Sequence, residues 1–525
     1  MSGPAPTRPT VAAWLDRGWR LVERGFNRVY GSAWSPLYQS GVLAVVFLAV
    51  TLVTGLYLFL FYKVADPYGS VAAIDRGAIG GFMRSAHRYA ADLAVLAVAV
   101  HALKMLLSGR TWGPRATAWV SGVLLVGVLL ICGWTGLVMA WDVQGQLVAI
   151  EGARLFDLLP IFSEPISRSF ARPEGVPDSF FFMNLFLHVA LPLGLLGLFW
   201  LHVSRVARPR LRPPAAIERH ALVVLCAGAI LVPVPLPPRA DLLAVPVGVP
   251  IDLFYAFWLP VAQNVSPLLH LAMWAAAAAV LLSLPWWWRP KERAITASHV
   301  DEARCTGCTT CYQDCPYEAI AMVPRETLSR LSAKVARVDP DLCVACGICA
   351  GSCAPMGVGP PERTGRDQLR QAEDFLAASP LTPGDTVLAA CRYGLGPHPS
   401  LMALDGVVPY ATGCSGSLHT SVIELLLRRG AGGVFVLTCP GRDCLYREGP
   451  KWLHERVYQG REAELRERVD KRRVRLASFA TSEAAAARRE LAAFCAEVAT
   501  LGEKPVERDV RIELECEVPD ELVVG

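Results

Sequence analysis

Four histidines lie inside long apolar segments at a repeated spacing of 14 residues. His87 and His101 share one segment, and His188 and His202 share another. Fourteen residues is close to four helical turns, so each pair lies on one helix face, roughly 21 Å apart along the axis. Two such helices facing each other form two bis-histidine sites, which suits two haems inside a helical bundle. The alternative, histidines that only hydrogen-bond between helices, does not account for two equal spacings.

Glycines repeat the same interval on two further apolar segments. They are Gly41, Gly55, Gly122 and Gly136. Because glycine has no side chain, it leaves room for a haem pressed against the helix, although small residues also serve helix packing alone. Arg84 and Arg88 lie near His87 and are candidates to pair with haem propionates. Arginine at a membrane edge can also act only as an anchor.

Eight cysteines form two runs of the pattern C-x2-C-x2-C-x3-C. This double run is typical of proteins with two [4Fe–4S] clusters, in which the fourth cysteine of each run binds the other cluster. One cluster is therefore assigned to Cys305, Cys308, Cys311 and Cys353. The second is assigned to Cys343, Cys346, Cys349 and Cys315. Zinc, which often binds isolated C-x2-C pairs, does not require eight cysteines in this register.

Four further cysteines follow predicted strands in the last third of the chain. Short apolar runs alternate there with helical stretches, near 386–391, 407–412, 433–439 and 473–479. This alternation favours an α/β domain with a parallel sheet. The cysteines at the strand ends are Cys391, Cys414, Cys439 and Cys444. Parallel strands place ligands at their carboxyl ends, so we expect one metal site; scattered buried thiols are the alternative.

Composition indicates a multidomain protein that is partly embedded in a membrane. The 525 residues are 53% hydrophobic and 19% charged, and twelve of the 16 cysteines lie within 305–444. A soluble protein is nearer 25% charged, and clustered cysteines in a long chain favour metals over disulfides. The net charge of +4 is too small to indicate nucleic-acid binding. The expected parts are an amphipathic arm (1–40), a membrane domain (41–290), a two-cluster domain (296–362), a linker (363–384), an α/β domain (385–500) and a tail (501–525).

Six segments are long enough to cross a bilayer, which takes about 20 residues each. They lie near 41–62, 86–107, 118–140, 184–205, 221–237 and 266–288. Lysine and arginine concentrate in the N-terminal arm, in alternate loops and after Trp288. The positive-inside rule therefore predicts an inner-membrane protein whose N-terminus and cysteine-rich domains are cytoplasmic.

The histidine half resembles cytochrome b of the bc1 and b6f complexes. The resemblance covers about 30–290 and rests on the histidine and glycine pattern, on RSAHRYAADL and on TGLVMAWDVQGQLVA. It implies an outer haem b on His87 and His188, an inner haem b on His101 and His202, and a homodimer. It also implies an outer quinone site, at which Asp252 stands where the family has a proton-accepting glutamate. An aspartate that only caps a loop is the alternative.

The last third resembles the delta subunit of methyl-viologen-reducing hydrogenases. The similar stretch is TGCSGSLHTSVIELLLRRGAGGVFVLTCPGRDCLYREG, within about 385–500. The resemblance implies a [2Fe–2S] cluster on the four strand-end cysteines and a domain that docks a dehydrogenase or a heterodisulfide-reductase-type flavoprotein. Gly394 stands where the family often has a further cysteine.

These features together predict the quinone-reactive membrane subunit of an oxidoreductase. It would pass electrons between a cytoplasmic iron–sulfur or flavin partner and the quinone pool, through one [2Fe–2S] cluster, two [4Fe–4S] clusters and two haems b. One alternative is a membrane anchor and electron adaptor without its own quinone site. Another is bc1-like quinol oxidation with a Rieske-type partner on the outer face.

Overall fold

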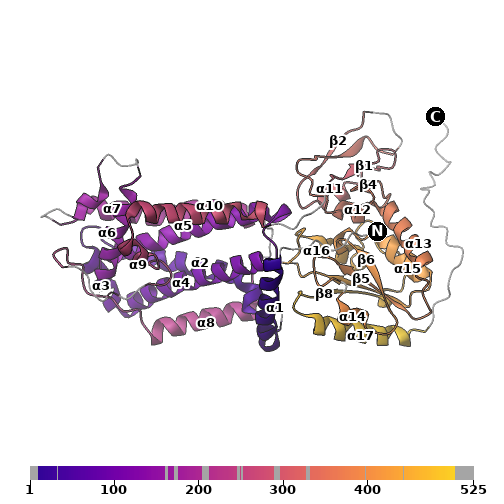
Figure 1. The fold of residues 1–525 in the computed structure, drawn as a ribbon, viewed down its shortest axis with the longest axis horizontal. Helices are drawn as coiled ribbons and strands as arrows, with labels where there is room; N and C mark the ends of the chain where they lie inside the picture. The colour runs from indigo at the N-terminus through magenta and orange to yellow at the C-terminus, as the bar shows by residue number, and fades with distance from the viewer. Residues whose placement is uncertain are drawn as a thin grey trace. The chain divides into compact units, whose positions relative to one another are not determined.

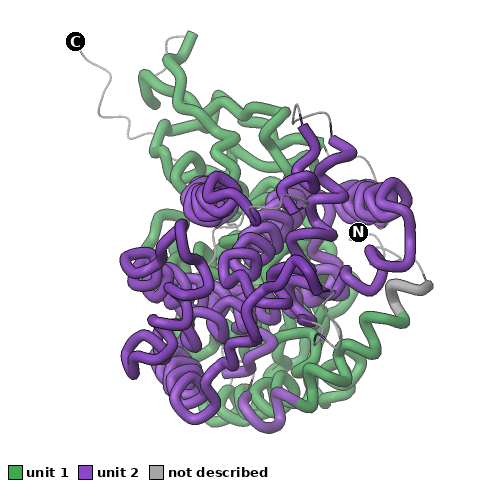
Figure 2. The backbone as a smooth tube through the Cα atoms, turned by 90° about the vertical axis from the view of Figure 1, so that its left-hand side faces the viewer, with its two compact units in different colours: residues 1–25, 290–525 green, residues 26–289 purple. Residues whose placement is uncertain are grey.

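In the computed structural model the chain divides into two compact units (Figure 2). One unit is formed by residues 26–289, and the other by residues 1–25 together with 290–525. We describe each unit by itself. The structure describes residues 10–31, 34–159, 164–170, 175–203, 212–244, 249, 252–288, 296–326, 331–396, 398–441 and 443–502. Cys516 and the predicted tail beyond 502 lie outside these residues. The amphipathic arm forms α1 (Thr10–Tyr30).

Long apolar helices build the membrane unit (Figure 1). Among the described residues, five helical segments are long and apolar enough to cross a membrane: Pro36–Phe61, Ala78–Leu107, Gly113–Ala140, Asp178–Val203 and Pro267–Trp287. They contain α2 (Pro36–Phe61), α4 (Ala78–Leu107), α5 (Ala116–Ala140), α7 (Asp178–Trp200) and α10 (Pro267–Trp287). α2 packs along α4, and α5 packs along α7.

The fifth predicted span, 221–237, lies six residues earlier in the structure than the sequence suggested. It forms α8 (Ala215–Leu231), a helix of 17 residues that packs on α4. The helix ends there because Pro233 and Pro235 follow at once, and proline cannot continue the backbone hydrogen bonds. The structure therefore does not confirm a count of six spans.

Three shorter helices lie between the spans. They are α3 (Pro67–Arg76), α6 (Val143–Phe156) and α9 (Leu259–Asn264). The carboxylate of Asp142 accepts the backbone N–H of Gly145 at 2.8 Å and so caps the start of α6. Trp141 packs edge-on against Phe181, which anchors the end of α5 to the start of α7.

The two cysteine runs lie in a small domain of short elements. β1 (His299–Val300) pairs antiparallel with β4 (Val358–Gly359), and β2 (Ile320–Pro324) pairs antiparallel with β3 (Lys334–Val338). Each run leads into one turn of helix, α11 (Thr310–Gln313) or α12 (Ile348–Ser352). The two loops have the same backbone conformation at corresponding positions, where φ is positive. These positions are Gly307 and Thr309 in the first run, and Ala345 and Gly347 in the second.

The predicted α/β domain is confirmed, with a four-stranded parallel sheet in the order β6-β5-β7-β8. The strands are β5 (Thr386–Cys391), β6 (Val407–Thr412), β7 (Gly433–Thr438) and β8 (Val474–Ser478). α13 (Gly365–Ala378), α15 (Thr420–Arg428) and α16 (Gly449–Tyr458) pack in one buried cluster, and α14 (Pro399–Met402) and α17 (Ala484–Thr500) pack in a second.

Most of the predicted linker, 363–384, is helical in this structure. A capping box of Thr364 and Asp367 starts α13, which then buries Leu369 and Ala372 in the core of the α/β domain. The helix therefore packs as part of that domain.

Candidate cofactor sites

His87 on α4 and His188 on α7 face each other inside the membrane unit, with ring centroids 6.3 Å apart. A metal–imidazole nitrogen bond is roughly 2 Å and the ring centre lies about 1 Å behind the nitrogen, so two imidazoles on one metal have centroids about 6 Å apart. The two rings therefore fit one iron atom between them.

The neighbouring helices occupy the other nitrogen of each ring. Nδ1 of His87 lies 3.0 Å from the carbonyl oxygen of Thr51, and Nδ1 of His188 lies 2.9 Å from that of Cys132. A carbonyl oxygen only accepts, so Nδ1 carries the proton and Nε2 keeps its lone pair. This outer partner is the usual one for a metal-binding histidine, since it fixes both the tautomer and the ring orientation.

His202 repeats this arrangement at the other level of the bundle. The hydroxyl of Ser121 donates to the carbonyl oxygen of Thr117 at 2.8 Å, and its oxygen lies 2.8 Å from Nδ1 of His202. The hydroxyl proton is already used, so His202 donates through Nδ1 and keeps Nε2 for a metal.

Each of the four glycines lies against one of the four histidines. The pairs are Gly41 with His101, Gly55 with His87, Gly122 with His202, and Gly136 with His188. A Cβ atom would lie 2.8 Å from the ring of His101 at position 41, but 3.5 Å from that of His202 at position 122. The sequence indicates that these glycines leave the space that a haem needs. The structure adds that the space lies next to the imidazole rings.

Arg84 and Arg88, the candidate propionate contacts, pair with carboxylates of the chain. Arg84 donates to Asp75 at 2.7 Å, and Arg88 donates to Asp92 at 3.1 Å. Arg88 also forms an ion pair with Asp252. Contacts with propionates therefore stay a prediction.

Asp252 makes the contacts of a capping residue. It is buried and accepts the backbone N–H groups of Phe254 at 2.9 Å and Tyr255 at 2.6 Å, in addition to its ion pair with Arg88. The carboxylate oxygens of Asp252 therefore already have donors within the chain. Its role as a proton acceptor from a quinol stays a prediction, and Pro250 and Ile251 just before it lie outside the described residues.

Tyr255 is a candidate that the sequence did not single out. Its ring fills the place of a side chain at Gly133, where a Cβ atom would lie 1.9 Å from the ring. The guanidinium of Arg88 lies 5.6 Å from the ring centroid. Its buried hydroxyl has no hydrogen-bond partner among the described residues. Its signal in the sequence is its place at the end of the stretch 250–255, which the cytochrome b resemblance matches to a Pro-Glu-Trp-Tyr element of the quinone site.

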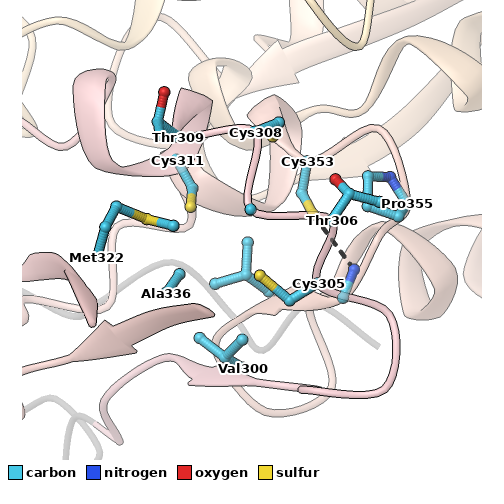
Figure 3. Close-up of a pocket in the computed structure, with 13 residues that line it drawn as sticks. Val300, Cys305, Thr306, Cys308, Thr309, Cys311, Met322, Ala336, Cys353 and Pro355 are labelled. Atoms are coloured by element: carbon cyan, nitrogen blue, oxygen red, sulfur yellow. Dashed lines mark hydrogen bonds between the residues drawn. The ribbon is translucent and has the colours of Figure 1, made fainter. Parts of the chain in front are cut away.

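The eight cysteines of the two runs line two separate cavities. Cys305, Cys308, Cys311 and Cys353 line the first, and Figure 3 shows sulfur atoms of this set pointing toward a shared space. Cys315, Cys343, Cys346 and Cys349 line the second. Each cavity thus collects three cysteines of one run and the last cysteine of the other, the division expected for two [4Fe–4S] clusters.

The thiols of both cavities are set up as buried ligands. Burial raises the pKa of Cys353 to about 11 and that of Cys349 to about 12, so without iron they are neutral at pH 7. Backbone N–H groups already point at sulfur, from Gly357 to Cys353 at 3.3 Å and from Ala319 to Cys315 at 3.4 Å. Iron would displace the thiol protons, and these N–H groups would then stabilise the thiolates.

The four strand-end cysteines are all buried together. They lie at or after the carboxyl ends of the adjacent strands β5, β6 and β7. The sulfur atoms of Cys391 and Cys439 are 3.6 Å apart, and hydrogen bonds from Cys414 and Cys439 hold the pKa of Cys391 well below its usual range. Four buried cysteine sulfurs gathered in one place are a donor set that suits an iron–sulfur cluster.

Gly394 lies at the edge of this group. A Cβ atom there would be 3.4 Å from Cβ of Cys439, an ordinary contact distance. The position at which relatives carry a further cysteine therefore borders the site, although here it contributes no ligand.

Comparison with known families gives three matches along the chain. Residues 27–208 match cytochrome b/b6/petB, residues 304–357 match the 4Fe-4S dicluster domain, and residues 405–502 match the delta subunit of methyl-viologen-reducing hydrogenase. These matches confirm the fusion that the sequence motifs predicted.

Individual relatives match the membrane unit. The chain is 26% identical over 186 residues to the menaquinol:cytochrome c reductase cytochrome b subunit of Geobacillus thermodenitrificans, covering 34% of this chain and 82% of that protein. It is 38% identical over 139 residues to cytochrome b6 of Gloeobacter violaceus, covering 26% and 64%. A chain of a solved hyperthermophilic respiratory complex III is 21% identical with a TM-score of 0.40, covering 52% of this chain and 82% of that one.

The fold and these matches define a membrane electron-transfer protein. Its membrane part has the cytochrome b fold, which implies haem b, and its two-run domain implies iron–sulfur clusters.

Proposed function

We propose that this chain carries single electrons between a cytoplasmic iron–sulfur or flavin enzyme and the membrane quinone pool. The proposed groups are a [2Fe–2S] cluster, two [4Fe–4S] clusters and two haems b, which supply one-electron redox chemistry when bound. The chain's own residues hold these groups and exclude water from them. The chain would then be the quinone-reactive membrane subunit of a larger oxidoreductase.

The observation that carries the proposal is the shared burial of cysteines from two domains. Cys346, from the second C-x2-C run, packs in one cluster with the four strand-end cysteines. Tyr446 and Trp452, both largely buried, belong to the same cluster. The shared burial of these cysteines supports electron exchange between the candidate [4Fe–4S] and [2Fe–2S] sites.

The partner is inferred from the α/β domain and from the distribution of charge. The similarity to a hydrogenase delta subunit supports a cytoplasmic dehydrogenase or a heterodisulfide-reductase-like flavoprotein as the partner. Lysine and arginine between and after the spans support a cytoplasmic location of both cysteine-rich domains. A homodimer stays a prediction from the cytochrome b resemblance.

A quinone site is proposed beside Tyr255. Its unpartnered buried hydroxyl can donate to a quinone carbonyl, and Asp252 lies three residues earlier in the same turn. Because Asp252 is already satisfied by Arg88 and two backbone N–H groups, we expect Tyr255 to contribute more to quinone binding than Asp252 does.

The test of the carriers is a redox titration of the purified full-length chain, followed by optical and EPR spectroscopy, with haem, iron and sulfide quantified. We expect signals from two haems b, two [4Fe–4S] clusters and one [2Fe–2S] cluster. Intact iron–sulfur signals without haem would contradict the proposal and favour a membrane-anchored adaptor.

The quinone site has its own test. Reduction of haem by a quinol is compared between the native chain, Tyr255→Phe and Asp252→Asn. We expect Tyr255→Phe to slow it more than Asp252→Asn. If the native chain takes no electrons from a quinol, the adaptor alternative holds. If it does so only with a high-potential acceptor bound on the outer face, the Rieske-type alternative holds.

A further inference from the structure

Arg456 on α16 is fully buried in the cysteine-rich unit. Its Nη1 donates to the hydroxyl of Ser352 at 2.9 Å, and its Nη2 donates to the carbonyl oxygen of Gly416 at 2.7 Å. Nη1 lies 3.9 Å from the carboxylate of Asp314, which is fully buried as well. Arg456 therefore joins the α/β domain to both cysteine-run segments.

Each of these three partners stands close to a candidate iron–sulfur ligand. Asp314 directly precedes Cys315, and Ser352 directly precedes Cys353. Gly416 follows Cys414 by two residues. One guanidinium thus reaches segments of all three candidate cluster sites.

Arg456 belongs to a network of two arginines and two carboxylates, because Arg461 pairs with Asp314 and also with Glu455. Asp314 also accepts from the hydroxyl of Ser352 at 2.6 Å and from Nε of Arg461 at 2.9 Å, so one carboxylate is shared between two arginines. Arg461 is partly exposed, whereas Arg456 is not. Burial lowers the pKa of Arg456 to about 10, which leaves it charged at neutral pH. Arg456 therefore brings a positive charge, out of reach of solvent, to the carbonyl oxygen of Gly416, while the carboxylate of Asp314 lies 3.9 Å away and is shared with Arg461.

Stability alone does not account for this arrangement. The desolvation of a buried ion pair offsets much of the attraction between its charges, and apolar residues of similar volume stabilise an interface as well or better. The Nε–H of Arg456 also has no hydrogen-bond partner among the described residues, a further cost. A buried charge that does not stabilise the fold, yet contacts segments of all three candidate cluster sites, suggests an electrostatic role.

We propose that Arg456 is a positioning residue that raises the reduction potential of the [2Fe–2S] site of the α/β domain. Reduction adds one negative charge to that site, and a nearby positive charge in a medium of low dielectric stabilises it. In the transfer concerned, the [2Fe–2S] cluster and the neighbouring [4Fe–4S] cluster exchange one electron, and no proton moves and no bond changes. The inference rests on the proposed function, since it presumes that both clusters are bound.

The test is an EPR-monitored redox titration of the full-length protein, with iron and sulfide quantified in each variant. We expect Arg456→Met to shift the [2Fe–2S] potential downward and Arg456→Lys to retain most of the native potential. Asp314→Asn removes a negative charge from the same network and is expected to shift the potential upward. Arg461→Met is the matched control, because its partly exposed charge is better screened and its downward shift should be smaller.

Opposite shifts in Arg456→Met and Asp314→Asn, with iron content unchanged, support the inference, because a purely structural role would not reverse sign. Shifts in the same direction, or none, overturn it while leaving the proposed function intact. If Arg456→Met loses its clusters, Asp314→Asn decides alone: an upward shift supports the inference and any other result overturns it. A native protein without a [2Fe–2S] signal contradicts the proposed function itself.

Discussion

The membrane unit and the cysteine-rich unit position their candidate ligands by different means. In the membrane unit each histidine comes from the middle or end of a long helix, and a glycine on the adjacent helix gives its ring space. In the cysteine-rich unit the ligands sit on tight loops, with positive φ at matching positions in both runs. Regular helices make ligand positions periodic along the sequence, whereas loops depend on a few permissive residues.

The second difference is the source of the outer hydrogen bonds. Thr51 and Cys132 hold His87 and His188 through backbone carbonyl oxygens. These contacts survive most changes of side chain. The charge network of the cysteine-rich unit instead depends on Arg456 and Asp314, so single substitutions can change it. In the membrane unit, the sensitive changes should therefore be loss of a ligand or closer packing between helices. In the cysteine-rich unit, they should be changes of charge or of backbone strain in the loops.

The largest expected effect is the loss of a whole haem from the membrane unit. His188→Ala removes one of two facing ligands, so we expect haem content to fall to about half. The iron–sulfur content should stay unchanged, because those ligands lie in the other unit. The haem-to-protein ratio from the pyridine haemochrome spectrum measures this. His270→Ala is the matched control, since His270 is a buried histidine of α10 that packs on Trp258 and Trp274. Equal loss in both variants would contradict the assignment of His188.

A smaller effect is expected where a methyl group is added beside a histidine ring. At Gly55 a Cβ atom would lie 2.9 Å from the ring of His87, but at Gly122 only 3.5 Å from that of His202. We expect Gly55→Ala to cost about 1–3 kcal/mol of stability through overpacking and to lower haem retention on heating. Gly122→Ala keeps an ordinary contact distance to the ring of His202, so it should lower haem retention less. The opposite order would mean that the glycines serve another purpose.

The loops of the cysteine-rich unit allow a comparable test. Gly307 has φ +70°, and a Cβ atom there would lie 2.9 Å from the carbonyl oxygen of Lys334. Gly307→Ala should therefore weaken the first candidate cluster, with a backbone cost of roughly 1–2 kcal/mol before the clash is counted. EPR spin counts of the two [4Fe–4S] signals measure it. Ala345→Gly, at the corresponding position of the other run, relieves strain and should leave both signals intact.

The smallest expected effect concerns the outer hydrogen bonds of the haem ligands. Nδ1 of His188 has two polar neighbours. The carbonyl oxygen of Cys132 lies 2.9 Å away and accepts its proton, and the hydroxyl of Thr135 lies 3.1 Å away. Thr135→Val removes only the weaker of two contacts, worth about 0.5–1.5 kcal/mol. We expect full haem content and a small shift of one haem potential in an optical titration. Loss of haem would show that the carbonyl group alone cannot orient the ring.

Sequence reasoning was strongest where spacing encodes position. The 14-residue intervals place the two histidines, or the two glycines, of each helix on one face, because helix geometry converts spacing into a common face. The cysteine runs and the strand ends likewise predict which thiols gather. The end of the fifth span was predicted six residues too late, at 237, because the hydrophobic residues continue past Pro233, where the helix cannot.

Other features had no local signal. The carbonyl oxygens that hold His87 and His188 belong to the backbone, which the residue types do not reveal. Arg456 looks like any helical arginine, and its burial depends on Asp314, 142 positions earlier in the chain. The helix in the predicted linker depends on a core that only the folded sheet provides.

The exchange of cysteines between the two runs has a consequence for how the domain matures. Cys353 lines the cavity of the first run, and Cys315 lines that of the second. During synthesis the ribosome releases Cys305 through Cys311 long before Cys353, so neither cavity has its four thiols until the second run has emerged. Iron insertion would then follow translation of the whole domain, and a ribosome stalled between the runs would leave thiols exposed to oxidation.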